Sequence, residues 1–208
     1  MIETFKFGGL VFIAYLLGSI PFGLLLSALF SNQDVRRRGS GNIGATNVLR
    51  VVGAKLGLLT LFLDVLKGAL PVFIALQLIN APENPWTQAY LSLVAMSAFT
   101  GHLYPLYLGL QDGGKGVATG WGCFLILSPI SALITLLTFI LTVCVSKKAS
   151  LASLSGSAVL SLAIWYTTHS AVFTLCAALM TLLIIYRHKE NIIRLIHGDE
   201  PSIWGQKR

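Results

Sequence analysis

Charged residues are scarce in this sequence of 208 residues. They make up 11% of the chain, well below the roughly 25% that is usual in soluble domains. Hydrophobic residues reach 55%, and the mean hydropathy is +0.77. This composition excludes an ordinary soluble domain and indicates an integral membrane protein. We interpret the net charge of +7 as the excess of basic residues in cytoplasmic loops rather than as a nucleic-acid surface.

Cysteine is scarce as well, and its positions exclude the common kinds of disulfide and metal site. Cys123, Cys144 and Cys176 lie in apolar runs and lack the spacing of metal ligands. We therefore expect buried free thiols, without disulfides or a zinc site. The first apolar run, residues 7–30, is too long for the core of a signal peptide and has no clear cleavage site. It is expected to be a retained helix.

Long apolar stretches predict an all-α, polytopic membrane protein, because a spanning helix needs about 20 apolar residues. The stretches cover residues 7–30, 56–79, 86–110, 116–146 and 149–186. The first is interrupted near Gly18 and Pro21. The last contains 38 residues, which would extend about 57 Å as one helix, too long for a single crossing. It is therefore predicted to be a hairpin with its break at residues 167–170.

The stretch 116–146 is harder to interpret, because a break at Ser128-Pro129 would leave two short crossings. Two hairpins give seven crossings, whereas single crossings give five. With the N-terminus outside and seven crossings, cytoplasmic loops hold 13 of the 15 lysine and arginine residues, all except Lys6 and Lys67. The outer loop 80–85 then has no basic residue. By the positive-inside rule we expect one domain, residues 1–208, with about seven transmembrane helices and a cytoplasmic C-terminus.

Three polar, glycine-rich segments lie beside the apolar stretches: residues 39–50, 112–119 and 188–195. In the expected orientation all three face the cytoplasm. They offer exposed backbone N–H groups and cationic or amide side chains, which are suited to holding phosphate. The sequence therefore predicts an enzyme for an anionic, lipid-linked substrate.

Residues 39–44 match the pattern G-x-G-x-x-G, but a dinucleotide site is excluded because a membrane helix, not a strand, precedes them. Small residues still let the backbone approach an anion, and Ser40 and Asn42 add hydrogen-bonding groups. The alternative is a plain tight turn. Residues 109–115 resemble the start of a P-loop, yet Gly116 stands where the magnesium-binding hydroxyl would be, which argues against an ATPase. This segment is either a phosphate cradle with Lys115 or a basic, flexible turn.

In the third segment, helical spacing places His188, Asn191 and Leu195 on one face, with Arg194 on an overlapping face. The alternative is a solvated basic helix end capped by Gly198. Two further features lie in the apolar stretches. His102 is either a site residue or an ordinary interfacial histidine, and its position next to the lysine loop favours the first. Asp64 and Lys67 are either functional or a neutralising pair that holds helix positions.

Taken together, these segments resemble the motifs of the bacterial acyl-phosphate-dependent glycerol-3-phosphate acyltransferase family, as do residues 19–23 and 64–68. One difference is that the stretch from His102 to Lys115 is one residue longer, with Gln111-Asp112 in place of a single residue. The resemblance implies transfer of a fatty acyl group from acyl phosphate to the sn-1 hydroxyl of glycerol 3-phosphate. The products are lysophosphatidic acid and phosphate, in the first step of membrane phospholipid synthesis.

The resemblance also implies the setting and the site. The enzyme would lie in the bacterial inner membrane with its active site facing the cytoplasm, use no cofactor or metal, bind no nucleic acid, and be linked functionally to the enzyme that makes acyl phosphate. Catalytic roles are implied for Ser40, His188 and Asn191. Substrate-binding roles are implied for Gly39, Gly41, Asn42, Thr46, Asn47, Arg50, Gly113, Gly114, Lys115, Gly116 and Arg194.

The expected roles follow the chemistry. Ser40 would polarise the acyl carbonyl, Arg50 and Lys115 would neutralise phosphate, and His188 and Asn191 would orient glycerol hydroxyls. His188 is one candidate base and a donor phosphate oxygen is the other. A transporter would show inverted repeats, which are not seen, and a lipid-binding scaffold would need only basic clusters. An acyl-CoA-dependent enzyme with an H-x-x-x-x-D motif is excluded, because no histidine has an aspartate five residues on.

Overall fold

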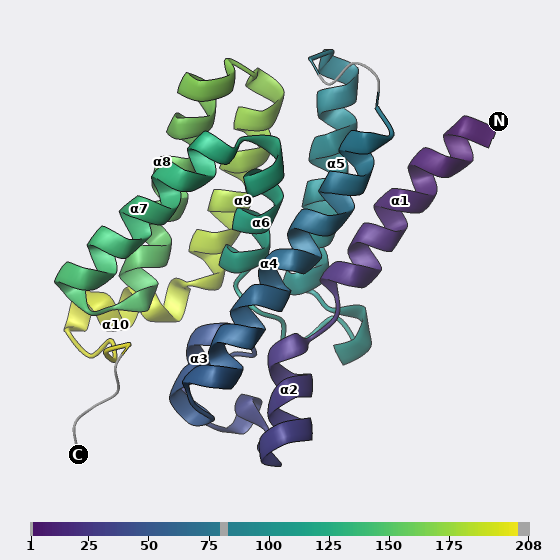
Figure 1. Ribbon diagram of the computed structural model, residues 1–208. Coiled ribbons are helices and arrows are strands. Elements are labelled where there is room, and N and C mark those ends of the chain that lie inside the picture. Colours follow the sequence, from purple (N-terminus) through teal and green to yellow (C-terminus); the bar gives the residue numbers. More distant parts are fainter. Residues whose placement is uncertain (1, 80–82, 204–208) are drawn as a thin grey trace. The chain divides into compact units, whose positions relative to one another are not determined.

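The structure is a computed structural model that describes residues 2–79 and 83–203 (Figure 1). Every regular element within these residues is a helix. The chain forms two compact units, Met1–Leu127 and Ser128–Arg208, and each is described by itself. Residues 80–82 of the predicted outer loop, together with Lys207 and Arg208, lie outside the described residues. The expectation of a single domain stays a prediction.

The first unit is built around α4, which packs against α3, α5 and α6, while α1 packs against α5. Its interior includes the fully buried side chains of Phe99 and Phe124. The elements in chain order are α1 (Ile2–Gly18), α2 (Phe22–Ser31), η1 (Val35–Arg37), α3 (Ala45–Val51), α4 (Ala54–Gln77), α5 (Pro85–Leu103), η2 (Leu106–Leu108) and α6 (Val117–Leu127).

The predicted interruption of the first apolar run is confirmed, because α1 ends at Gly18 and α2 begins at Phe22. Pro21 precedes α2 and has no N–H to continue the ladder of α1. The Ser19 hydroxyl donates a hydrogen bond to the Tyr15 carbonyl (2.8 Å) at the same place. The two helices bend by 40° at this break.

The helix predicted for residues 86–110 is shorter than expected, because α5 ends at Leu103. Pro105 disfavours helical dihedrals in the residue before it, and Tyr104 accordingly has φ −130° and ψ 71°. The chain continues through η2 to Gly109, which has a left-handed conformation (φ 64°). Because α5 stops early, a long connection leads to α6. It contains η2 and then the second glycine-rich motif.

The second unit consists of α7, α8 and α9, packed in sequence, followed by the short helix α10. The bounds are α7 (Pro129–Ser146), α8 (Ala149–Thr168), α9 (Ala171–Arg187) and α10 (Lys189–His197). The breaks predicted near Ser128 and at 167–170 are both confirmed. Hydroxyl groups stabilise α7 against α8, since Ser131 and Thr167 lie 2.6 Å apart and Ser128 contacts both.

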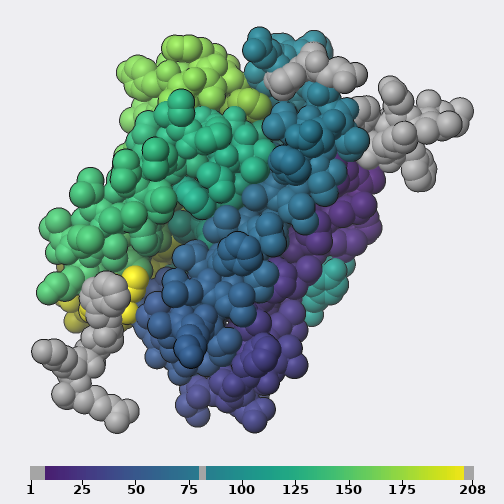
Figure 2. Space-filling model, in the orientation of Figure 1, coloured from purple at the N-terminus to yellow at the C-terminus, as the bar shows by residue number. Residues whose placement is uncertain are grey.

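Among the residues that the structure describes, three helices are long and apolar enough to cross a membrane, namely α4, α7 and α8, and there are up to five spans if each bent pair counts as one. The bent pairs are α1 with α2 and α9 with α10. Helices α4 and α7, parts of which are visible on the face in Figure 2, carry many exposed leucine and isoleucine side chains, as lipid-facing helices do. The count of seven crossings and the orientation stay predictions.

The three cysteines are free, as predicted. Cys123 and Cys176 are buried, but the expectation is wrong for Cys144, which is exposed on α7. The hydrophobic periodicity of an intramembrane helix does not reveal which apolar side faces lipid, so the sequence could not distinguish Cys144 from the other two.

Candidate active site

The first glycine-rich segment is a loop that one buried side chain holds in shape. Asn47, on α3, accepts a hydrogen bond from the Ser40 N–H (2.8 Å). Its Nδ2 group donates to the carbonyls of Val35 (2.9 Å), Arg38 (3.1 Å) and Asn42 (2.8 Å). Asn47 is 2% exposed. Asn47 was predicted to bind substrate. In the structure its side chain lies behind the loop and supports it through these hydrogen bonds.

The tip of this loop is exposed and carries Ser40 between two glycines. Gly39 and Gly41 have φ values of 61° and 71°, a conformation that costs other residues roughly 1–2 kcal/mol. Asn42 closes the turn by accepting from the Gly44 N–H (2.8 Å), and Gly44 then begins α3. The loop therefore presents Ser40 at an exposed, glycine-flanked position.

Helix α3 follows the loop directly and carries two of the predicted binding residues. Thr46 and Arg50 are four residues apart in α3, so they lie on one face of this helix, and both are partly buried. Arg50 lies in the last turn of α3. The structure thus places a hydroxyl and a guanidinium group on one face of the helix that follows the loop.

The second glycine-rich segment is buried and tightly packed, which excludes the flexible-turn alternative. A Cβ atom added to Gly113 would overlap the backbone of Leu103, and one on Gly114 would overlap the His102 ring. Gly116 has φ 84° and packs against Phe99. The Gly114 N–H donates to the His102 carbonyl (3.0 Å). Each of these glycines is thus required by conformation or by close contact.

Lys115 lies within this packed segment and is partly buried, one residue after Gly114 and just before α6. Its backbone position is set by the glycines on both sides. The ring of His102, which was predicted to belong to the site, packs directly against Gly114 and supports this segment; its role in the site stays a prediction. A lysine on a rigid backbone pays less ordering entropy when it binds an anion than one on a flexible turn.

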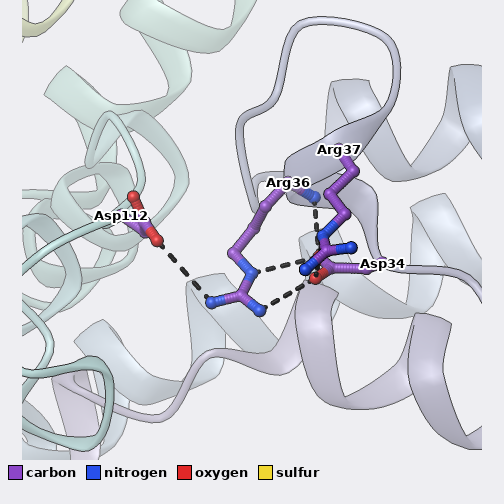
Figure 3. A network of polar contacts seen from close by, with 4 residues as sticks. All are labelled: Asp34, Arg36, Arg37 and Asp112. Carbon is purple, nitrogen blue, oxygen red and sulfur yellow. Dashed lines mark hydrogen bonds and ion pairs between the residues drawn. The ribbon is translucent and has the colours of Figure 1, made fainter.

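A network of charged groups connects the two segments (Figure 3). The Arg36 guanidinium binds Asp34 through Nη2 (2.8 Å) and Nε (3.0 Å), and its Nη1 lies 3.6 Å from Asp112. The hydrogen bond from Arg36 lowers the pKa of Asp34 to about 2. Asp112 belongs to the one-residue expansion noted in the sequence. Because both partners are substantially exposed, at 36% and 59%, the Arg36–Asp112 pair contributes less than about 1 kcal/mol.

The third segment begins at His188, which is 2% exposed and lies between α9 and α10. Its Nδ1 atom is 2.8 Å from the carbonyl oxygen of Ile184. A carbonyl can only accept, so we assign the proton of the neutral ring to Nδ1. This leaves Nε2 as the basic atom. The chain bends by 61° at this point, which gives the imidazole a defined place at the junction of two helices.

Asn191 and Arg194 are fixed by a carboxylate that sequence analysis missed. Asn191 Nδ2 donates to Glu200 Oε1 (2.7 Å), and Arg194 Nε donates to Glu200 Oε2 (2.8 Å). The Glu200 side chain is 1% exposed. Its burial favours a higher pKa, but the donors of Ser150, Asn191 and Arg194 and the positive charge of Arg194 outweigh burial, so the pKa of Glu200 lies below its ordinary value.

The signal for Glu200 was present but weak. Gly198 caps α10 in the left-handed conformation (φ 82°), as the sequence predicted. The Asp199 N–H then donates to the Arg194 carbonyl (2.8 Å). A chain that turns back in this way brings the next acidic residue to the preceding helix. A solvated basic helix end, the alternative interpretation of this segment, does not account for these contacts, because Asn191 and Arg194 are both bound to the buried Glu200.

The first two segments belong to one unit and are joined by the Arg36–Asp112 pair, whereas the third lies in the other unit. Within the described residues, no group of three or more histidine, cysteine, aspartate and glutamate side chains could hold a metal ion. The first unit holds two glycine-rich segments that are fixed by contacts, and the second unit holds a buried imidazole with an anchored amide and guanidinium.

Comparison with known proteins gives a consistent result over nearly the whole chain. The family model for glycerol-3-phosphate acyltransferase matches residues 9–198. The glycerol-3-phosphate acyltransferase of Trichlorobacter lovleyi is 48% identical over 190 residues, covering 91% of this chain and 93% of that protein. That of Syntrophotalea carbinolica is 44% identical over 187 residues, covering 90% and 92%.

Solved structures agree with the sequence relatives. The glycerol 3-phosphate form of PlsY (YgiH), an integral membrane glycerol 3-phosphate acyltransferase, is 38% identical with a TM-score of 0.88, and 95% of each chain is covered. Its lysophosphatidic acid form is 37% identical with a TM-score of 0.85 and the same coverage. The chain therefore belongs to the glycerol-3-phosphate acyltransferase family.

Proposed function

We propose that this protein transfers a fatty acyl group from acyl phosphate to the sn-1 hydroxyl of glycerol 3-phosphate. The observation that carries the proposal is the packed segment 113–116, whose glycines are fixed by contact and which presents Lys115 beside the start of α6. Such a segment suits a phosphate that must be held in one orientation. The related PlsY structures are glycerol 3-phosphate and lysophosphatidic acid forms, which supports the acceptor and the product.

The reaction balances without a cofactor or metal, because acyl phosphate is already an activated carboxyl. The sn-1 oxygen attacks the acyl carbonyl carbon and forms the ester bond. The bond between that carbon and the phosphate oxygen then breaks, and inorganic phosphate leaves with the bonding pair. The Ser40 hydroxyl would stabilise the carbonyl oxygen as negative charge develops there. Arg50 and Lys115 would neutralise the two phosphates, which otherwise repel each other.

The hydroxyl proton has two possible acceptors. His188 Nε2 is the basic nitrogen when Ile184 fixes the other ring nitrogen as the donor, and the ordinary pKa of histidine, about 6.5, suits general base catalysis. A phosphate oxygen of the donor could take the proton instead. His188→Ala separates them: a base at His188 predicts loss of the acid limb of the pH–rate profile, whereas a phosphate base predicts the same limb at a lower rate.

A donor assay tests the function. Purified protein receives glycerol 3-phosphate with acyl phosphate, acyl-CoA or acyl carrier protein loaded with the same acyl chain, with and without EDTA. We expect lysophosphatidic acid and phosphate in equal amounts from acyl phosphate, unchanged by EDTA. Full activity with acyl-CoA and none with acyl phosphate would overturn the proposal.

We also propose that the enzyme resides in the bacterial inner membrane with its site on the cytoplasmic side. The support is the placement of basic residues in the loops that the seven-crossing arrangement puts inside. Acyl phosphate is a reactive, amphiphilic molecule, so we expect a functional link to the enzyme that makes it. Glycerol 3-phosphate is soluble and would reach the same face.

A further inference from the structure

Helix α4 carries two charged side chains that the proposed chemistry does not use. Asp64 and Lys67 are 2% and 4% exposed, and Lys67 Nζ lies 2.9 Å from Asp64 Oδ1. They are three residues apart in a helix that is apolar and long enough to span a membrane. Charges in such a place are costly and are usually retained for a function. Each of the two side chains also has a second partner, and the two partners lead in different directions.

Lys67 supports the first glycine-rich segment through α2. Its Nζ donates a hydrogen bond to the Ile20 carbonyl (2.8 Å), in the break between α1 and α2, and lies 5.6 Å from the centre of the Phe22 ring. One residue further, Gly23 packs so closely that an added Cβ would overlap the Ile43 carbonyl oxygen. Ile43 lies within the loop that carries Ser40. Lys67 thus fixes the start of the helix on which this loop rests.

Asp64 supports the second segment through His102. Asp64 Oδ1 lies 3.7 Å from His102 Nδ1, and both side chains are almost fully buried. On the opposite edge of the ring, the Nε2 atom lies so close to Gly114 that a Cβ added there would overlap it. The Gly114 N–H also donates to the His102 carbonyl (3.0 Å). A change in the orientation of the His102 ring would therefore displace the backbone that carries Lys115.

Backbone contacts also connect the turn of α4 that carries the pair with α6. Gly68 packs directly against the Thr119 carbonyl, and Gly122 packs against the Val65 carbonyl. These contacts leave no side chain between α4 and the first turns of α6. Since α6 begins directly after Gly116, the turn of α4 that carries the pair is in register with the end of the second glycine-rich segment.

We infer that Asp64 and Lys67 are positioning residues for acyl transfer, and that this one buried pair holds both glycine-rich segments in mutual register. Lys67 acts on residues 39–44 through Ile20 and α2, and Asp64 acts on residues 113–116 through His102. Neither touches a substrate. The inference rests on the proposed function for its kinetic readout, but not for its structural one.

The kinetic test separates positioning from simple charge neutralisation. Asp64→Leu and Lys67→Met each leave a buried charge without its partner and should lower the melting temperature and kcat/KM together. The double variant removes both charges with side chains of similar volume. A neutralising pair predicts that it regains both melting temperature and kcat/KM. A positioning pair predicts that it regains the melting temperature while kcat/KM stays at least tenfold below that of the wild type.

Hydrogen exchange gives a readout independent of activity. Lys67→Met should speed amide exchange in peptides covering residues 20–23 and 39–44, and Asp64→Leu in those covering 113–116. Ser131→Ala is the matched control, because it removes buried hydroxyl contacts in the other unit. It should lower stability, leave kcat/KM within twofold and leave exchange in these peptides unchanged.

A double variant with wild-type kcat/KM, or single variants without faster exchange in the named peptides, would overturn the inference. If the wild type makes no lysophosphatidic acid from acyl phosphate, the proposed donor fails. The exchange measurements then still decide whether the pair supports the two segments.

Discussion

The two glycine-rich segments of the first unit use glycine for different reasons. In residues 39–42 the loop tip is exposed, and glycine permits left-handed backbone around Ser40 while Asn47 holds the loop from behind. In residues 113–116 the glycines are buried and admit no side chain, because Leu103, His102 and Phe99 occupy the space. The first segment exposes Ser40 at its tip, and the glycines of the second segment fix its shape. Substitution of Ser40 should therefore affect chemistry, whereas substitution of the glycines in the second segment should affect architecture.

The largest effect is expected from Gly114→Ala. The added methyl group would overlap the buried His102 ring, which costs roughly 1–3 kcal/mol of stability, and a displacement of about 1 Å at the site can cost about 100-fold in rate. Melting temperature and kcat/KM should fall together. Gly8→Ala, in α1 with no atom near the added Cβ, is the control; because alanine favours a helix more than glycine does, it should not lower the melting temperature and should leave kcat/KM unchanged. An active, stable Gly114→Ala protein would break the comparison.

Ser40→Ala should affect chemistry without affecting the fold. The residue is exposed at the loop tip, and its backbone N–H keeps its bond to Asn47 in the variant. If the hydroxyl stabilises the transition state, kcat should fall by about 100-fold or more at unchanged melting temperature. Steady-state kinetics with acyl phosphate measure the change in kcat, and thermal unfolding measures the melting temperature. A rise in KM alone would show that Ser40 only binds substrate.

Lys115→Ala should have a smaller effect that is confined to binding. The lysine contributes a cation to the cradle, and a hydrogen bond to a charged group is worth about 1.5–3 kcal/mol, which corresponds to a rise of about 10-fold or more in the KM for a phosphate substrate. Lys115→Arg keeps the charge and should recover part of this loss. A loss in kcat with unchanged KM would place Lys115 at the reacting carbonyl instead.

The sequence predicted the helices and motifs well where the signal is local. Pro21 marks the break between α1 and α2, and Gly198 marks the end of α10. The end of α5 at Leu103 was missed although Pro105 indicates it, because the apolar run continues to Leu110. Local signals of this kind depend only on neighbouring residues, so they can be read without the fold.

Features that depend on tertiary contact could not be predicted. Asn47 looked like a binding residue in the motif, yet it supports the loop that Ser40 occupies. Glu200 lies outside the predicted third segment, residues 188–195. Its role is visible only in the fold, where the chain turns back and Glu200 accepts a hydrogen bond from Asn191. The packing of Gly114 on His102 joins residues from two elements, and glycine in a sequence does not distinguish a flexible turn from a crowded one.

The smallest effect is expected at the charged network between the segments. Asp112→Asn removes the carboxylate 3.6 Å from Arg36 Nη1; because the pair is exposed, unfolding free energy should change by less than about 1 kcal/mol, and kcat/KM by less than threefold. A loss above tenfold would show that this network, and not the buried pair on α4, holds the segments together.

The same network has a defined pH dependence. The pKa of Asp34 is lowered to about 2 from 3.8, so the stability it contributes is complete above the ordinary value and is lost only as the pH falls through about 2. Between about pH 5 and pH 8 this contribution should therefore be constant, so Asp34 should add no pH dependence to thermal unfolding in that range. A stability change at Asp34→Asn that varies across that range would contradict this assignment.

The central proposal, that all three motifs face the cytoplasm, is tested most directly by cysteine accessibility. The test starts from an active variant that lacks Cys123, Cys144 and Cys176. Single cysteines are then introduced at one exposed position near each motif and at one in the predicted outer loop: Arg37, Gln111, Glu190 and Glu83. The account predicts that Glu83→Cys reacts with an impermeant maleimide in spheroplasts with an intact inner membrane, and that the other three react only after permeabilisation. Labelling of any of those three in sealed spheroplasts would contradict the proposed cytoplasmic placement of the motifs.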